Sequence, residues 1–281
     1  VAYDPNKKEW GVAVQSKFLA CAAVVSWARA GAGAVATQSF ANIAYGIEGL
    51  NLMERDVSAP DAIEALTAAD GNRAQRQVGM VDRNGRAAAF TGEGCYDWAG
   101  HIVGEGFACQ GNILVPGTVE AMAAAFEEAR RGPGELADWL VGALAAGQAA
   151  GGDSRGRQAA GVMVVGHNGG YGGNNDRYLD LRVDDHPEPI EKLAELVTMH
   201  HLLFGEVDPD KLVSLASVAG DLQKVLRRTG HLKRAADGEF DDEMRVALRA
   251  LVGSENLEER WNGTDEMIDS VVFDFLLRRY G

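Results

Sequence analysis

The sequence is poor in cysteine and has no long apolar run. Its three cysteines, Cys21, Cys95 and Cys109, form an odd set without CxxC spacing, which excludes a disulfide framework and is typical of a reducing compartment. No stretch reaches about 18 apolar residues, the length that a membrane-spanning helix needs. The first residues, from Val1 to Pro5, show neither the basic nor the apolar region of a signal peptide. We therefore expect a cytoplasmic protein that does not cross a membrane.

Basic residues are also scarce. The chain carries 27 Lys and Arg against 41 Asp and Glu, which gives a net charge of -14. Phosphate groups are bound by clustered Lys and Arg, so this balance argues against a nucleic-acid partner and against an anionic membrane surface. Hydrophobic residues make up 46% of the chain, which is enough to build a folded core.

The motifs that bind metals and nucleotides are missing as well. There is no HExxH and no cysteine pair at ligand spacing, and the adjacent His200 and His201 would point about 100° apart on a helix. The segment from Gly151 to Gln158 has Arg-Gln where a phosphate loop requires Lys followed by Ser or Thr. We expect neither a metal nor a cofactor.

Glycine, in contrast, is abundant. Of the 35 glycines, 28 precede residue 205. The segment from Gly205 to Pro209 is rich in turn residues and is typical of a linker. We therefore expect two domains, 1–204 and 205–281.

In the first domain, blocks with strand and helix patterns alternate. Asn84-Gly85 between two apolar runs predicts a hairpin, and Ser58 with Pro60 predicts the start of a helix. Strands are expected over 10–17, 33–39, 77–82, 86–91, 101–103, 106–114, 158–166 and 178–183, and helices over 44–55, 59–69, 118–130, 135–148 and 189–201. Helix pairs between strands argue against a doubly wound fold. We expect an α+β fold with two stacked antiparallel sheets covered by helix pairs, a four-layer αββα sandwich.

The second domain shows helical periodicity throughout. Apolar residues recur at intervals of three and four over 212–228, 241–252 and 264–280. Asp241 and Thr264 are the expected caps of the last two helices. The pattern predicts a small domain of three helices and no strands.

One short motif resembles a catalytic signature. Gly152-Asp-Ser-Arg-Gly156 matches the G-x-S-x-G pattern, with Ser154 in the place of the nucleophile. That pattern requires a strand before it and a helix after it, whereas here the predicted order is reversed. A serine hydrolase using Ser154 is therefore our third hypothesis, beside the simpler interpretation of a polar loop.

Polar residues gather where the predicted strands meet loops. Binding and catalytic groups concentrate at such positions because the scaffold fixes the backbone while the side chain stays accessible. The residues are Ser16, Lys17, Thr37, Gln38, Ser39, Asn42, Cys95, His101, Gln110, Asn112 and 153–158. Together they predict a polar pocket, although each alone is also explained as a cap or turn residue.

Several blocks of the first domain follow one another in a recognisable order. They are Lys17-Phe-Leu-Ala20, Gly33-Ala-Val-Ala-Thr-Gln38, Phe90-Thr-Gly-Glu93, Trp98-Ala-Gly-His101, Gln110-Gly-Asn-Ile-Leu114, Ala146-Gly-Gln-Ala-Ala-Gly-Gly-Asp153, Arg155-Gly-Arg-Gln158 and Asp180-Leu-Arg-Val-Asp-Asp-His186. The set resembles an uncharacterised bacterial family, the domain of unknown function 1028, whose members are assigned an Ntn-hydrolase-like (N-terminal nucleophile) fold. The resemblance covers roughly residues 1–201. The second domain, through 222–226, Gly230 and 237–240, is similar to a peptidoglycan-binding-like helical domain.

The resemblance implies the αββα sandwich and the hydrolysis of an amide or peptide-like bond in a small substrate. In Ntn hydrolases the nucleophile is a Thr, Ser or Cys at the N-terminus of the first strand, and its own α-amine acts as the base. Val1 has neither a hydroxyl nor a thiol. Two interpretations remain open. Either a short segment ahead of Val1 supplies the nucleophile, or the fold binds a ligand without catalysis and its helical tail docks a cell-wall glycan or another partner.

The enzymatic interpretation assigns roles to the residues of the predicted pocket. The catalytic candidates are Lys17, Thr37, His101, Asn112 and Asp153, and the substrate-binding candidates are Ser16, Gln38, Ser39, Asn42, Gln110, Arg155, Arg157 and Gln158. Lys17 would tune the pKa of the nucleophile, Asn112 with Gln110 would donate to an oxyanion, and His101 would transfer protons.

The arginines have a binding role in this scheme. Asp153, Arg155 and Arg157 would orient a substrate carboxylate, Arg by bidentate pairing. A solvated strand-end Lys, a backbone-bonded His and a structural salt-bridge loop remain the simpler explanations of Lys17, His101 and the two arginines. Because relatives of this fold often assemble, a homo-oligomer is also expected.

Overall fold

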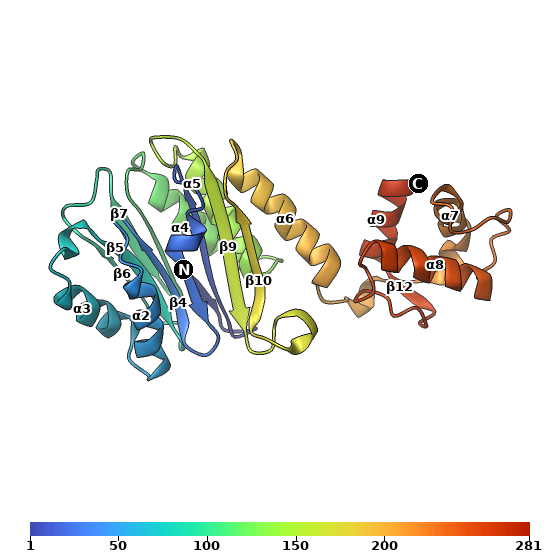
Figure 1. The fold of residues 1–281 in the computed structure, drawn as a ribbon, viewed down its shortest axis with the longest axis horizontal. Helices are drawn as coiled ribbons and strands as arrows, with labels where there is room; N and C mark the ends of the chain where they lie inside the picture. Colours follow the sequence, from blue (N-terminus) through green and yellow to red (C-terminus); the bar gives the residue numbers. More distant parts are fainter. The chain divides into compact units, whose positions relative to one another are not determined.

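The computed structural model describes all 281 residues, and these form two compact units, Val1–Val197 and Thr198–Gly281. The sequence placed this boundary at residues 204 and 205. Each unit has its own hydrophobic core, and each is described by itself (Figure 1).

The first unit contains two antiparallel sheets. One has six strands in the order β10-β9-β2-β1-β8-β7, and the other has four in the order β3-β4-β5-β6. The strands of the first sheet are β1 (Ala2–Asp4), β2 (Glu9–Ser16), β7 (Gly100–Gly104), β8 (Phe107–Gly111), β9 (Ala159–Gly166) and β10 (Arg177–Val183). Those of the second are β3 (Ser26–Arg29), β4 (Gly33–Gln38), β5 (Gln77–Asp82) and β6 (Ala87–Thr91). The predicted hairpin at Asn84-Gly85 is confirmed, because β5 and β6 pair on either side of it and Gly85 has the φ of +78° that favours glycine.

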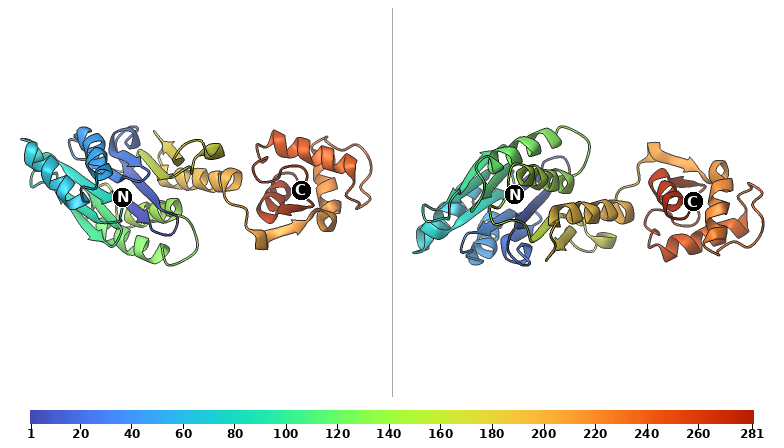
Figure 2. Two further views of the ribbon diagram at one scale, coloured as in Figure 1. Left: turned by 90° about the horizontal axis from the view of Figure 1, so that it is seen from below. Right: turned by 90° about the horizontal axis from the view of Figure 1, so that it is seen from above.

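Helices cover one face of each sheet (Figure 2). α2 and α3 pack on the four-stranded sheet, whereas α4, α5 and the first part of α6 pack on the six-stranded sheet. The helices are α1 (Ala22–Val25), α2 (Ala44–Glu54), α3 (Ala59–Ala69), α4 (Thr118–Ala129), α5 (Leu136–Ala149) and α6 (Pro189–Phe204), with short 3-10 turns at Arg73–Gln75 and Tyr171–Gly173. As predicted, α3 begins at Ser58, whose hydroxyl accepts a hydrogen bond from the Asp61 backbone.

The mixed α+β class, with antiparallel sheets and helix pairs between strands, is confirmed. The strands β1 and β3 were not predicted. They span three and four residues, which is too short for a strand to show a clear alternating pattern.

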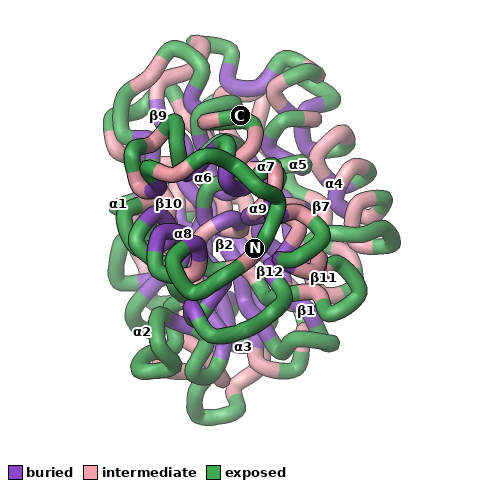
Figure 3. The backbone as a smooth tube through the Cα atoms, turned by 90° about the vertical axis from the view of Figure 1, so that its right-hand side faces the viewer, coloured by how far each residue is buried: buried purple, intermediate pink, exposed green.

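Strand β2 divides the core of the first unit into two layers. Trp10, Val12 and Val14 face the other sheet and belong to the cluster between the sheets. On the opposite face, a Cβ added at Gly11 would lie 2.5 Å from Leu140 Cδ1, so glycine allows α5 to approach the sheet closely. The central strands β2, β4, β5, β8 and β9 are mostly buried, and the exposed residues lie largely on the outside of the tube (Figure 3).

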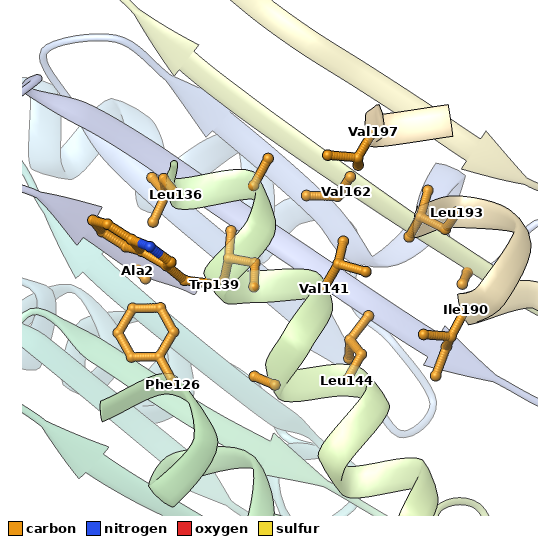
Figure 4. Packing of buried hydrophobic residues seen from close by; sticks show 14 of the residues in the cluster. Ala2, Phe126, Leu136, Trp139, Val141, Leu144, Val162, Ile190, Leu193 and Val197 are labelled. Carbon is orange, nitrogen blue, oxygen red and sulfur yellow. The ribbon is translucent and has the colours of Figure 1, made fainter. Parts of the chain in front are cut away.

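The largest core cluster lies between the six-stranded sheet and its helices. Phe126 of α4 packs edge-on against Trp139 of α5, with ring centroids 6.4 Å apart. Leu193 of α6 joins the same cluster (Figure 4). This packing fixes α5 over the middle of the sheet.

The second unit is not purely helical, which corrects the prediction. A two-stranded sheet of β11 (Leu212–Ser214) and β12 (Met267–Asp269) accompanies α7 (Leu215–Arg228), α8 (Asp242–Ser254) and α9 (Ser270–Tyr280), and a 3-10 turn spans Pro209–Lys211. Both strands lie directly before a helix, so the predicted helical ranges 212–228 and 264–280 included them. Asp241 caps α8 as predicted, but α9 is capped by Asp269 and not by Thr264.

The core of the second unit is built from large aliphatic side chains of its three helices. Leu222, Leu226, Leu248 and Leu276 are fully buried. None of the helices in either unit combines the length and apolar character required to cross a bilayer.

Candidate functional site

A cavity of about 710 Å³ lies at the N-terminal end of β1, inside the six-stranded sheet. β1 pairs with β2 over Ala2–Asp4, while β2 continues to Ser16 and β8 continues to Gly111. The Val1 and Ala108 backbones still exchange two hydrogen bonds of 3.0 Å. The cavity lies between the ends of β2 and β8, past the level of Val1.

The walls of the cavity come from both faces of the sheet. Met122, Phe126, Leu140 and Leu144, of α4 and α5, form an apolar wall. Polar side chains come from the ends of β2, β4 and β8 and from the loop before β9; they are Ser16, Gln38, Ser39, Gln110, Asn112, Asp153 and Arg155. An apolar wall with a few convergent polar groups is the usual composition of a small-molecule site.

Asp153 is the most highly connected of these polar groups. Its carboxylate is only 5% exposed and accepts hydrogen bonds from the Lys17 backbone at 3.1 Å and from Arg155 Nη2 at 2.7 Å and Nε at 3.0 Å. Burial alone would raise the pKa of Asp153, but the hydrogen bonds from Arg155 and from the backbone outweigh it and lower the pKa. The carboxylate is therefore ionised at neutral pH and holds Arg155 at the cavity.

A chain of hydrogen-bonded side-chain amides lies on the side of the polar cluster away from Asp153 and includes Gln38, Gln77 and Asn112. Gln38 Nε2 donates to Gln77 Oε1 at 3.0 Å and approaches Asn112 Oδ1 at 3.5 Å. Gln77 is fully buried and donates in turn to Thr91 Oγ1 at 2.9 Å and to the Gly111 carbonyl at 2.8 Å. Because the Asn112 oxygen is used by Gln38, the Asn112 amide nitrogen is left to donate to a ligand.

Three further amide atoms at the cavity have no hydrogen-bond partner. They are Gln15 Nε2, Gln110 Oε1 and Gln148 Oε1, all buried and all on residues that line the cavity. A buried polar atom without a partner costs about 1–3 kcal/mol, so such atoms are rare outside binding sites. They offer a ligand one donor and two acceptors.

Seven of the predicted site residues line the cavity, and six do not. Those outside are Lys17, Thr37, Asn42, His101, Arg157 and Gln158. Thr37 lies next to Gln38 on β4 and therefore on the opposite face, where its hydroxyl donates to the Asn42 carbonyl at 3.2 Å. The Asn42 side chain donates to Asp70 at 3.2 Å.

The remaining outer residues support the loops of the site. Lys17 Nζ donates to the Arg157 carbonyl at 3.3 Å, and Arg157 pairs with Glu191 at 3.2 Å. Gln158 donates to Asp185 at 3.1 Å. These contacts fix the ends of β2 and β9.

His101 lies outside the cavity but connects with it through hydrogen bonds. Its Nδ1 lies 2.8 Å from Thr91 Oγ1, which accepts from Gln77. Burial lowers the pKa of His101, which favours the neutral ring at pH 7. The histidine thus ends the amide chain that leads to Asn112.

The sequence analysis missed Gln15, Gln77 and Gln148. Gln77 carried a usable signal, because a polar residue at the start of an apolar strand must find partners when it is buried. Gln148 lies on α5, far from any predicted strand end, so nothing in the sequence connected it with the site.

The buried cysteines and Ser154 are not activated as nucleophiles. Burial raises the pKa of Cys109, which lines the cavity, and raises that of Cys21 to about 12, so both are thiols at neutral pH. Ser154 is exposed on the turn between α5 and β9 and does not line the cavity. Nowhere in the chain do three or more His, Cys, Asp or Glu side chains gather as a metal site.

Comparison with known proteins gives two family matches. The model of a family of unknown function, DUF1028, matches residues 1–193, and a model described as "Putative peptidoglycan binding domain" matches residues 202–276. The crystal structure of protein SPO2555 from Silicibacter pomeroyi, titled with the family model DUF1028, is similar at 28% identity and a TM-score of 0.64. The match covers 71% of this chain and 84% of that one. No curated protein matches the chain.

Proposed function

The chain belongs to the DUF1028 family of unknown function, and we propose that its first unit hydrolyses an amide or peptide-like bond in a small substrate. The observation that carries the proposal is the position of the cavity. It lies at the N-terminal end of β1 between β2 and β8, among convergent polar side chains. We assign the unit to the four-layer Ntn-hydrolase sandwich, in which the nucleophile is presented from that end of the first strand.

The register of β1 supports a specific place for the nucleophile. Val1 lies opposite Ala108 of β8 and, by continuation of the β1–β2 pairing, opposite Val12 of β2. A residue attached four positions ahead of Val1 would lie opposite both Ser16 and Asn112 and would share the face of Val1. A Thr, Ser or Cys at this position would reach the polar cluster, with its α-amine as base.

The polar groups have matching roles in this proposal. The Asn112 amide nitrogen, together with Gln110, stabilises the oxyanion that develops on the substrate carbonyl. Asp153 is a positioning residue that holds Arg155, and the remaining N–H groups of Arg155 bind a substrate carboxylate. His101 and Lys17 act on the site through Thr91 and Asp153 and not on the substrate itself.

The test uses two matched proteins that carry the tetrapeptides Thr-Val-Ser-Val and Ala-Val-Ser-Val ahead of Val1. The two valines would face the apolar wall, and the serine would face Gln110 Oε1. We expect hydrolysis of N-acyl amino acid amides, and a β-lactone adduct on the N-terminal fragment by mass spectrometry, with the threonine protein only. Adding Asn112→Ala should remove turnover and leave the fold intact. No adduct and no turnover with either protein would overturn the proposal.

A ligand-binding protein without catalysis is the second candidate. The unpaired amides of Gln15, Gln110 and Gln148 favour it, because in the chain that begins at Val1 they offer hydrogen bonds to an amide-containing ligand without any nucleophile. Calorimetric titration of the same N-acyl amino acid amides separates the two functions. Binding without turnover in the threonine protein would support this candidate.

For the second unit we propose a cell-wall glycan partner. The family match supports this proposal. A groove lined by the basic residues Lys224, Arg227, Arg228 and Lys233 supports it as well, because the chain as a whole is acidic. Peptidoglycan carries carboxylates on its stem peptides, which such a groove would attract. We expect the full chain to be retained on insoluble peptidoglycan and released by salt, and Arg227→Ala with Lys233→Ala to weaken retention. Retention that does not respond to salt or to these changes would contradict the groove as the site.

A further inference from the structure

Three aromatic side chains are exposed at the rim of the cavity. Phe18, Phe40 and Tyr96 are 53%, 56% and 60% exposed, and all three line the cavity. Phe40 and Tyr96 are in edge contact, with ring centroids 5.8 Å apart. Exposed aromatic groups that gather around a cavity mark a contact surface, because an isolated chain gains nothing by exposing them.

The backbone around Phe40 is strained in a way that places this side chain at the rim. Ser39 and Phe40 have φ values of +56° and +49°, two successive non-glycine residues in the left-handed region. Residues with side chains rarely adopt this conformation, and where they do the surrounding contacts hold them in it. Such strain is typical of ligand sites.

Arg76 supplies the contacts that hold the rim. Its guanidinium donates to the Phe40 carbonyl and, at 2.9 Å, to Asp70, while its own carbonyl accepts from the Cys95 thiol at 3.4 Å. Since Cys95 precedes Tyr96, one arginine connects the two loops that carry the facing rings. Asp70 is anchored in turn by the Tyr45 hydroxyl at 3.0 Å.

We propose that Phe18, Phe40 and Tyr96 form a subsite for an aromatic or branched apolar group of the ligand, next to the amide that enters the cavity. The rim is apolar while the interior offers amide and guanidinium groups, so the preferred ligand is an N-acyl amide with a bulky apolar side chain. A second copy of this chain is the competing occupant of the rim. The reaction of this ligand rests on the proposed amide hydrolysis, whereas its binding does not.

The test compares N-acetyl-phenylalanine amide with N-acetyl-alanine amide by calorimetric titration of the full chain. Because its phenyl ring is removed from water at the rim, we expect the phenylalanine probe to bind about tenfold tighter than the alanine probe. Phe40→Ala and Tyr96→Ala should each reduce this ratio towards one without changing the affinity for the alanine probe. Val246→Ala, at an exposed apolar site on α8, is the matched control and should leave the ratio unchanged.

The outcomes separate the possible failures. Equal binding of the two probes, or binding of neither, would overturn the subsite. A change of oligomeric state in Phe40→Ala, measured by light scattering, would assign the rim to a second copy and also overturn it. Discrimination between the probes, together with no turnover in the protein that carries the threonine extension, would keep the subsite and reject only the hydrolase.

Discussion

Gln223 of the second unit and the amides that line the cavity of the first unit differ in how far their buried atoms are paired. In the second unit, Gln223 is fully buried and satisfied: its nitrogen donates to Asp237 and to the Glu239 carbonyl, and its oxygen accepts from the Asp237 and Gly238 backbones. In the first unit, the cavity is lined by amides with unpaired buried atoms. Amides that are fully paired hold a structure together, whereas unpaired ones are available to a ligand.

The largest effect should come from breaking a buried ion pair of the second unit. Arg260 Nη2 lies 2.6 Å from Asp269 Oδ2, and both side chains are buried. Asp269→Ala leaves the buried Arg260 charge without its carboxylate and removes the cap of α9, so we expect the second unit to lose about 3–5 kcal/mol of unfolding free energy. Urea unfolding followed by hydrogen exchange of the α7, α8 and α9 amides, read by mass spectrometry, measures it. Asp221→Ala, in an exposed pair with Lys224, is the control and should cost less than about 1 kcal/mol.

Gln223→Leu tests the paired amide of the comparison. The change removes four hydrogen bonds to the loop at 237–239 and leaves the backbone N–H groups of Asp237 and Gly238 without their acceptor. We expect a loss of about 2–3 kcal/mol in the same urea experiment. A change within about 0.5 kcal/mol would contradict the structural role of this amide.

Gln15→Leu tests the unpaired amide and should have the opposite sign. Leucine has a similar volume and removes a buried donor that has no partner. We expect the first unit to gain up to about 1 kcal/mol, and the chain to bind N-acyl amides more weakly. Destabilisation as large as that of Gln223→Leu would show that Gln15 has a structural partner.

Acid should affect the first unit more than the second. Hydrogen bonds from Arg76 lower the pKa of Asp70 strongly, and those from Arg155 lower that of Asp153 against its burial. A carboxyl whose folded pKa is depressed stabilises the fold above its unfolded pKa of about 3.9, and this contribution is lost as the pH falls further towards the folded pKa. Urea unfolding at successive pH values should show this loss, and Asp70→Asn should make it shallower. An unchanged slope in Asp70→Asn would contradict the assignment.

Sequence patterns grouped the residues that line the cavity better than they separated them from neighbours that do not. Ser16, Asn112 and Asp153 were found because all three lie at strand ends, and the ends of β2 and β8 line the cavity. Thr37 and Gln38 were predicted together although neighbours on a strand face opposite ways, so the alternation of β4 could have separated them. Gln148 lies on α5, and only the packing of that helix brings it to the cavity.

The short strands of the second unit mark another limit. β12 has three residues and directly precedes α9, and its Ile268 also fits the helical spacing of the residues after it. Pairing with β11 decides the conformation, and a contact between segments so distant in sequence leaves no local pattern.

Gly11 finally determines how much room the cavity has. The atom that its missing side chain would meet, Leu140 Cδ1, is the mobile end of a residue that itself lines the cavity. A methyl group at this position of β2 would therefore force Leu140, and with it one wall of the cavity, to shift. One hydrogen atom in place of a methyl group thus preserves the position of a cavity-lining side chain, from a residue that does not itself line the cavity.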